Sequence, residues 1–162
     1  MTLPLDRRPV VVAIAGANGA GKTTFYRSHL QAAGLRFMDA DVLAGELSLD
    51  HYVAGSMGDS LRRELIAQGE SFVFETVFSD TVGDKVALGY STILCFGGIS
   101  SAEVSDQRVA MRVTQRALRE VPHVFIFDND DLRRPFRLAA VLENGACVQL
   151  NKPLPKWLKP IV

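Results

Sequence analysis

The sequence predicts a three-layer α/β fold, in which a parallel sheet carries helices on both faces and a β-hairpin follows near the C-terminus. Short apolar runs alternate along the chain with amphipathic stretches, the order that βαβ units produce. The apolar runs are continuous, which is typical of strands buried on both faces of a parallel sheet. With 162 residues, the chain is expected to form a single domain over residues 1–162.

Five runs are expected to form the parallel strands: Val10–Ala15, Arg36–Asp39, Ser71–Thr76, Ser91–Phe96 and Val121–Phe127. Pro9 and Gly16 bound the first run, and the turn sequence "GGIS" follows the fourth. Acidic residues lie at the ends of three runs: Asp39 and Asp41, Glu75, and Asp128. Because ligands gather at the carboxyl ends of parallel strands, these acids are candidates for a site.

Helices are expected between the strands. The first runs from Lys22 to about Ala33 and is closed by Gly34. A second ends at Gly69, and its apolar face is predicted from residues four apart: Met57, Leu61 and Leu65. A third is expected over residues 80–88.

A longer helix is expected from Ser100 to about Glu120. Ser100 and Glu103 have the spacing of a capping box at its start. Its apolar face is formed by three residues: Val109, Val113 and Ala117.

The C-terminal part predicts a β-hairpin over Arg137–Leu150. Asn144 and Gly145 tolerate the positive φ angles of a type I′ turn and therefore mark the turn. The basic, Pro-rich tail that follows is expected to pack through Trp157 and its prolines.

Composition excludes several classes of function. Lys plus Arg and Asp plus Glu both number 18, so no overall charge attracts nucleic acid or an anionic membrane. No apolar stretch approaches the length that spans a bilayer, and we expect a cytoplasmic protein. Cys95 and Cys147 lie in apolar segments without metal-ligand spacing and are expected to be buried free thiols.

The segment "GANGAGKT" matches the phosphate-binding motif G-x-x-x-x-G-K-[ST], or Walker A, and lies between an expected strand and an expected helix. Glycines in such a loop let backbone N–H groups point at a β-phosphate, and Lys22 would neutralise the β- and γ-phosphates. Thr23 would ligate Mg²⁺. The sequence therefore predicts an ATP and Mg²⁺ site formed by these residues: Gly16, Ala17, Asn18, Gly19, Ala20, Gly21, Lys22, Thr23 and Thr24.

Five segments together resemble the zeta toxin family of P-loop kinases, over most of residues 9–150: "IAGANGAGKTTFYRSHL", "FMDADVLA", "GESFVFETVFS", "GYSTILCFGGISSAEVSDQRVAMRV" and "HVFIFDNDDLRRPFRL". The resemblance implies a nucleotide-kinase-like P-loop NTPase fold. It also implies transfer of the γ-phosphate of ATP to a hydroxyl of UDP-N-acetylglucosamine. In its positions, Asp41 corresponds to the acid that orients and deprotonates the acceptor, while Glu75 and Thr76 correspond to residues that contact it.

The residues themselves leave several readings open. Asp41 suits a general base, because phosphoryl transfer needs one acceptor for the hydroxyl proton, but it also suits an N-cap. Glu75 follows an apolar strand and needs a partner, such as a sugar hydroxyl or Mg²⁺ reached through water. Asp39 is expected to be structural. Asp128 and Asn129 either border the nucleotide base or form a turn rich in side-chain hydrogen bonds.

A basic stripe on the helix after Ser100 is formed by residues four apart, with one on the next turn: Arg108, Arg112, Arg116 and Arg119. The stripe either clamps phosphates, with Arg112 in the position of the family's first lid arginine and Arg108 near the substrate, or is a solvated helix flank. The chain departs from the family here, because "RVTQRALRE" leads directly into "VPHVFIF" without the usual second lid helix. An arginine on the transferred phosphate contributes about 10³ to 10⁵ in rate, so activity depends on a substitute.

The favoured function is a phosphotransferase of the zeta toxin type with a small-molecule alcohol as acceptor and an antitoxin protein as a possible partner. The alternative is an ATP-binding module without catalytic activity, disabled by its shortened lid. A motor-type NTPase is disfavoured because the chain offers no further domain.

Overall fold

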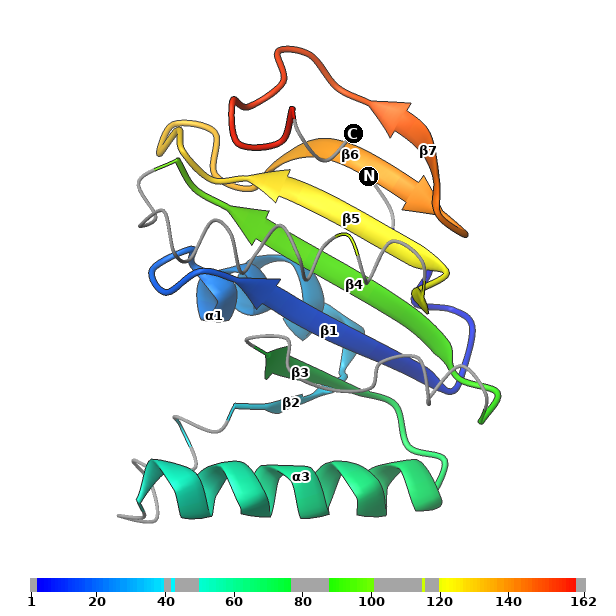
Figure 1. The fold of residues 1–162 in the computed structure, drawn as a ribbon. Helices are drawn as coiled ribbons and strands as arrows, with labels where there is room; N and C mark the ends of the chain where they lie inside the picture. The colour runs from blue at the N-terminus through cyan, green and yellow to red at the C-terminus, as the bar shows by residue number, and fades with distance from the viewer. Residues whose placement is uncertain are drawn as a thin grey trace.

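The computed structural model describes residues 3–39, 42, 50–76, 88–100, 115 and 120–159. Their core is a seven-stranded sheet with the order β2-β3-β1-β4-β5-β6-β7 (Figure 1). The strands are β1 (Val10–Gly16), β2 (Arg36–Met38), β3 (Phe72–Thr76), β4 (Ser91–Gly98), β5 (His123–Asp128), β6 (Arg137–Glu143) and β7 (Ala146–Leu150). Strands β1 to β5 pair in parallel, and β6 and β7 continue the sheet in antiparallel. The α/β class, the parallel strands and the C-terminal hairpin are confirmed.

Strand β1 lies in the middle of the parallel part, between β3 and β4. Its residues Val10 to Ala15 are buried on both faces, as their continuous apolar character predicts. Strand order therefore reverses at β1, since the chain first goes to the edge strand β2 and back to β3 on one side, and then to β4 and β5 on the other. A reversal of this kind opens a crevice at the carboxyl ends of the strands.

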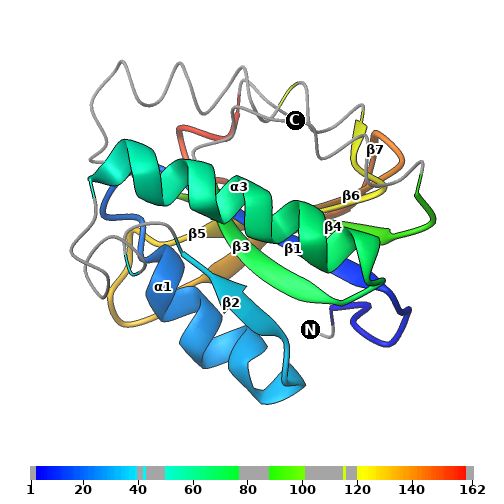
Figure 2. The ribbon, with the colours of Figure 1, turned by 90° about the horizontal axis from the view of Figure 1, so that it is seen from below.

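Two helical segments lie on opposite faces of the sheet (Figure 2). The first begins as α1 (Lys22–Phe25), widens to a π-helical turn over Tyr26–Leu30 and tightens to a 3₁₀ turn over Gln31–Ala33. It ends at Gly34, whose φ of 67° is in the left-handed region, as expected. The second is α3 (His51–Ala67).

Each face of the sheet has its own hydrophobic core. On one face, Phe25 and Leu30 of the first helical segment pack with strand residues such as Ile14 and Ile93. On the other, Leu65 of α3 and Leu158 of the tail pack with the opposite side chains of the same strands. The expected three layers are thus confirmed.

The predicted apolar face of α3 is only partly correct. Leu65 is 3% exposed, but Met57 is 45% and Leu61 is 38% exposed. The side of α3 that faces the sheet instead includes the buried Gly58. Four residues later on the same side, the guanidinium carbon of Arg62 lies 5.2 Å from the centre of the Phe74 ring. A glycine and an arginine guanidinium therefore face the sheet where the pattern predicted apolar side chains.

Strand β4 extends to Gly98, so the turn expected to begin at Gly97 is wrong at its first two residues. Gly97 pairs with Gly16 of β1, and Gly98 pairs with Asp128 of β5. A Cβ atom on Gly98 would lie 2.3 Å from the ring of Trp157. These glycines allow close approach at the carboxyl end of the strand, where the sequence predicted a turn.

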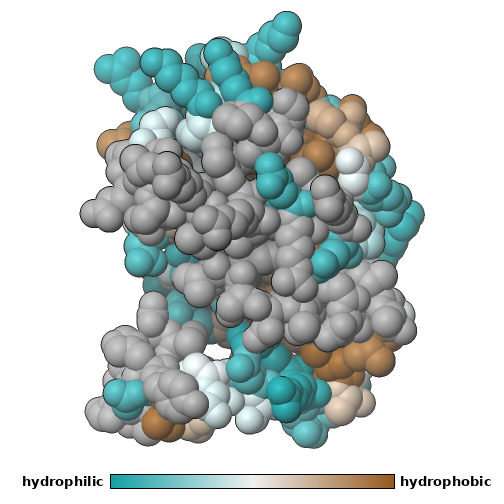
Figure 3. All heavy atoms as spheres, viewed as in Figure 1, coloured by the Kyte–Doolittle hydropathy of each residue, from teal (hydrophilic) through white to brown (hydrophobic). Residues whose placement is uncertain are grey.

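The hairpin turns at Asn144 (φ 48°) and Gly145 (φ 81°), as predicted. The tail also packs as predicted, with the ring centres of Trp157 and Phe96 6.0 Å apart and Leu158 fully buried. Figure 3 shows hydrophilic side chains gathered above this tail and hydrophobic ones beside them on the side of β7.

Both cysteines are free thiols, but only Cys95 is buried, and burial raises the pKa of its thiol. The expected burial of Cys147 is wrong, because β7 is the edge strand and all five of its residues are exposed.

The helices expected over 80–88 and from Ser100 to Glu120 fall outside the described residues, apart from Leu88, Ser100, Gln115 and Glu120. Among the helices that the structure describes, none has the length and apolar character needed to cross a membrane.

Candidate functional site

The predicted phosphate-binding loop connects the carboxyl end of β1 to the start of α1, at the point where strand order reverses. Gly19 and Gly21 both have a φ of 79°, which glycine adopts without strain. Gly21 is the N-cap of α1 and makes no side-chain cap hydrogen bond. The first N–H groups of a helix have no acceptor within it, and together with the helix dipole they favour an anion. The loop therefore has the form that the motif predicts.

Gly16 fixes the base of the loop against β4. A Cβ atom at this position would lie 2.4 Å from the carbonyl oxygen of Gly97 and 3.2 Å from the Cβ of Ala20. Only glycine fits between these two strands at the point where the loop leaves the sheet.

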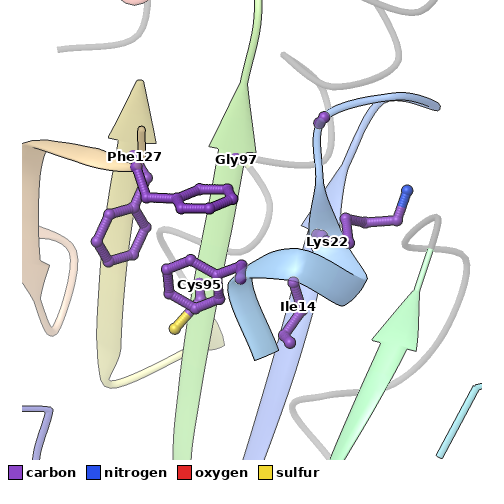
Figure 4. A pocket seen from close by; sticks show the side chains of 9 residues that line it. Ile14, Lys22, Cys95, Gly97 and Phe127 are labelled. Atoms are coloured by element: carbon purple, nitrogen blue, oxygen red, sulfur yellow. The ribbon is translucent and has the colours of Figure 1, made fainter. Parts of the chain in front are cut away.

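Lys22 is folded back onto the loop. Its Nζ donates to the carbonyl oxygens of Gly16 (3.2 Å) and Ala17 (3.3 Å) and lies 3.2 Å from Oε1 of Glu75. Figure 4 shows its side chain running away from Cys95 and Phe127. The lysine is 8% exposed, so its charge is compensated by oxygen atoms of the loop and of β3.

Glu75 comes from β3, where it pairs in register with Ile14 of β1. Sequence reasoning expected a magnesium or sugar partner for this carboxylate and missed its ion pair with Lys22. The signal that could have found the pair is topological, because a strand beside β1 brings its last residues to the phosphate-binding loop. Thr76 is the final residue of β3.

Two side chains at the loop have the chemistry of Mg²⁺ ligands. Mg²⁺ is usually held by one or two carboxylates together with phosphate oxygens and water. Thr23 in the first turn of α1 and Glu75 supply a hydroxyl and a carboxylate, which suit this ion. Among the described residues, no group of three or more acidic, His or Cys side chains forms a ready metal centre. The residues therefore fit a magnesium ion that arrives with a nucleotide.

Asp39 has the structural role expected of it. Its Oδ1 accepts a hydrogen bond from the N–H of Val42 at 3.4 Å, three residues later, as an N-cap does. Four predicted site residues lie outside the part of the chain that the structure describes: Asp41, Arg108, Arg112 and Arg116. Arg119 lies outside it too.

Asp128 and Asn129, at the end of β5, both bond to protein groups. Oδ2 of Asp128 accepts from Arg137 at 2.9 Å. Asn129 bonds to the phosphate-binding loop through Nδ2, which donates to the carbonyl oxygen of Ala20 at 3.1 Å. Sequence reasoning missed this contact, which joins residues more than one hundred positions apart.

A cavity of about 10 Å³ lies beneath the loop, lined by residues of β1, α1, β4 and β5 that include Ile14, Lys22, Cys95, Gly97 and Phe127 (Figure 4). A water molecule needs roughly 10 to 15 Å³ of such space. This space is about the size of one water molecule, so it is too small for a phosphate group.

No protein-family model and no curated protein matches the sequence. Solved structures do match the fold. A chain from the PezAT chromosomal toxin-antitoxin system of Streptococcus pneumoniae has a TM-score of 0.62 and 15% identity, with 96% of this chain and 77% of that chain covered. A candidate kinase from Chloroflexus aurantiacus has a TM-score of 0.47 and 15% identity, with 69% and 67% covered.

The first of these similarities bears out the fold that the sequence resemblance predicts. At this identity it establishes the arrangement of the elements, and the chemistry has to be argued from the site itself.

Proposed function

Because the chain has the fold of the zeta toxin-like P-loop kinases, we propose that it binds Mg-ATP and transfers the γ-phosphate to the hydroxyl of a small molecule. The proposed acceptor is a nucleotide sugar such as UDP-N-acetylglucosamine, which comes from the resemblance alone. The observation that carries the proposal is the glycine-rich loop at the carboxyl end of β1. Beside this loop, Nζ of Lys22 lies 3.2 Å from Oε1 of Glu75.

In the proposed reaction, the N–H groups of Gly19 to Thr23 bind the β-phosphate, and Lys22 leaves Glu75 to neutralise the β- and γ-phosphate oxygens. Thr23, with Glu75 through water, would hold Mg²⁺, which supplies charge neutralisation on the phosphates when bound. Thr24 completes the first turn beside the phosphates.

Asp41 is proposed to accept the proton of the acceptor hydroxyl as its oxygen bonds to the γ-phosphorus. The bond from the γ-phosphorus to the bridging oxygen breaks, and ADP leaves. Glu75 and Thr76 would orient the acceptor, with Arg108 and Arg112 on the phosphates. These assignments follow the family motif and stay predictions.

The alternative is an ATP-binding module that performs no transfer. The observation that favours it is the missing second lid helix, since the sequence passes directly from "RVTQRALRE" to β5. A site without a lid leaves the γ-phosphate open to water and short of an arginine.

Acceptor-dependent release of ADP separates the two. Purified protein with Mg-ATP is incubated with a panel of nucleotide sugars and nucleosides. Release that needs one acceptor, with phosphate found on it by mass spectrometry, supports the kinase. Tight ATP binding without turnover for any acceptor supports the module, and failure to bind ATP refutes both.

Substitution of Asp41 tests the base. Asp41→Asn should abolish acceptor-dependent turnover and leave the affinity for ATP unchanged, whereas full activity would exclude it. Asp6→Asn is a control, because Asp6 is exposed and precedes the amino end of β1, at the opposite edge of the sheet.

An antitoxin partner and a cytoplasmic location are further parts of the proposal. A protein from a toxin-antitoxin system shares the fold, which favours looking for a partner that suppresses activity. Copurification with a small protein encoded beside the gene is the measurement.

A further inference from the structure

Asn129 connects the loop after β5 to the phosphate-binding loop through both polar atoms of its side chain. Nδ2 donates to the carbonyl oxygen of Ala20 at 3.1 Å, and Oδ1 accepts from the N–H of Phe136 at 3.1 Å. These partners fix the orientation of the amide, because a carbonyl oxygen needs the NH₂ group and an N–H needs the oxygen. The backbone of Asn129 is itself held in place, because its N–H donates to the carbonyl oxygen of Gly98 at 3.0 Å.

The bond to Ala20 determines where a neighbouring N–H group points. In a planar trans peptide the C=O and the following N–H point in opposite directions. When Asn129 holds the carbonyl of Ala20 on its own side of the loop, the N–H of Gly21 must point to the other side. That N–H is among those expected to bind the β-phosphate.

Asn129 and Phe136 also pack closely against the backbone of Gly21. A Cβ atom on Gly21 would lie 3.1 Å from Nδ2 of Asn129 and 3.2 Å from Cζ of Phe136. The backbone of Phe136 has a φ of 55°, which is uncommon for a non-glycine residue. Its ring lies 5.4 Å from that of Phe25 in α1, edge to face. The segment Asn129–Phe136 therefore supports the back of the phosphate-binding loop.

The geometry points to Asn129 as a positioning residue that presets the phosphate-binding loop for the polyphosphate, without touching the nucleotide base. This inference rests on the proposed nucleotide site and adds a residue outside the motif to it. The two hydrogen bonds of the amide are directed at protein backbone, which favours a role in positioning the loop over contact with the nucleotide base.

The test compares binding of two probes, Mg-ATP and inorganic tripolyphosphate, by calorimetry. Tripolyphosphate has no base, so it reports on the loop alone. Asn129→Ala should weaken both probes by the same factor, about fivefold or more, as expected for one lost hydrogen bond. Asn151→Ala is the matched control, because the side-chain Nδ2 of Asn151 also donates to a backbone carbonyl at 3.1 Å, that of Leu138 in β6. It should lower thermal stability comparably and leave both affinities unchanged.

Asn129→Asp keeps the acceptor for Phe136 and removes only the donor, and it serves if Asn129→Ala does not fold. Its added charge also repels phosphate, but that effect is screened by salt. A loss of affinity relative to wild type that persists at about 0.5 M salt belongs to the missing hydrogen bond.

Three outcomes overturn the inference. If only Mg-ATP binding weakens, Asn129 contacts the base. If Asn129→Ala and Asn151→Ala change stability alike and neither changes affinity, its role is only structural. If the wild type binds neither probe, the proposed nucleotide site fails as well, and this result is distinct from the other two.

Discussion

Replacing Glu75 with Gln removes the negative charge that lies beside Lys22 before a nucleotide binds. Two unit charges 3.2 Å apart attract by about 5 kcal/mol at an effective dielectric constant of about 20. The side chains of Lys22 and Glu75 are 7% and 19% exposed, so desolvation offsets most of this attraction. A net value of about 1 to 2 kcal/mol remains, which is typical of a charge-assisted hydrogen bond.

A nucleotide has to overcome this net attraction, because its phosphates compete with Glu75 for the lysine. Glu75→Gln should therefore tighten the binding of metal-free ATP by about fivefold to thirtyfold. If Glu75 also holds Mg²⁺ through water, the gain in affinity that Mg²⁺ gives should shrink in the same variant. Calorimetry in EDTA and in excess Mg²⁺ measures both effects.

Asp128→Asn is the matched control. It removes another partly buried carboxylate, 2.9 Å from Arg137, at the carboxyl end of a different strand. It should change ATP affinity by less than about twofold. Unchanged or weaker binding of metal-free ATP to Glu75→Gln would refute the competition between carboxylate and phosphate.

Four further substitutions test contacts of the fold. Gly21→Ala should destabilise the protein more than Gly19→Ala. Both positions have a φ of 79°, but of the two only Gly21 has neighbours within 4 Å of an added Cβ atom. In denaturant unfolding, the free energy of unfolding should fall by about 1 kcal/mol for Gly19→Ala and by clearly more for Gly21→Ala. Tyr90→Phe should lower the free energy of unfolding by about 1 to 2 kcal/mol, since its hydroxyl donates to the carbonyl oxygen of Glu70, just after α3, at 3.0 Å. Burial raises the pKa of the Tyr90 hydroxyl. Its contribution to the free energy of unfolding is therefore complete below pH 10 and is lost as the pH rises through the pKa of the folded state. The Tyr90→Phe variant should not show this loss of stability at high pH. Gly98→Ala should displace Trp157, the single tryptophan, and shift its fluorescence emission to the red; unchanged emission would contradict the close contact.

The sequence was most informative where the physical constraint is local. Continuous apolar runs predicted the central strands β1 and β4, since strands buried on both faces carry few polar side chains. The edge strand β2 was predicted from a short run of which only Met38 is buried. Asn144 and Gly145 predicted the hairpin because few residues adopt their backbone angles. The loop after β1 was predicted from the spacing of its motif, Gly16, Gly21, Lys22 and Thr23, and Gly21 has a φ of 79° that glycine adopts without strain.

The contacts that sequence reasoning missed depend on which strands become neighbours. The pair of Lys22 with Glu75 requires β3 to lie beside β1, and the bond of Asn129 to Ala20 requires the loop after β5 to reach across β4. Burial of Cys147 was misjudged for the related reason that an apolar strand at the edge of a sheet looks like one in its centre.

The central position of β1 has a consequence for synthesis of the protein. Its residues are made early, yet Val11 pairs only with Phe72 and Thr92, which leave the ribosome much later. Until then the segment "VVVAIAG" is an uncharged, β-forming stretch without a partner, the kind of sequence that associates with its own copies. The ladders on both sides of β1 therefore form only after β3 and β4 have been made, and until then this stretch is exposed to other chains.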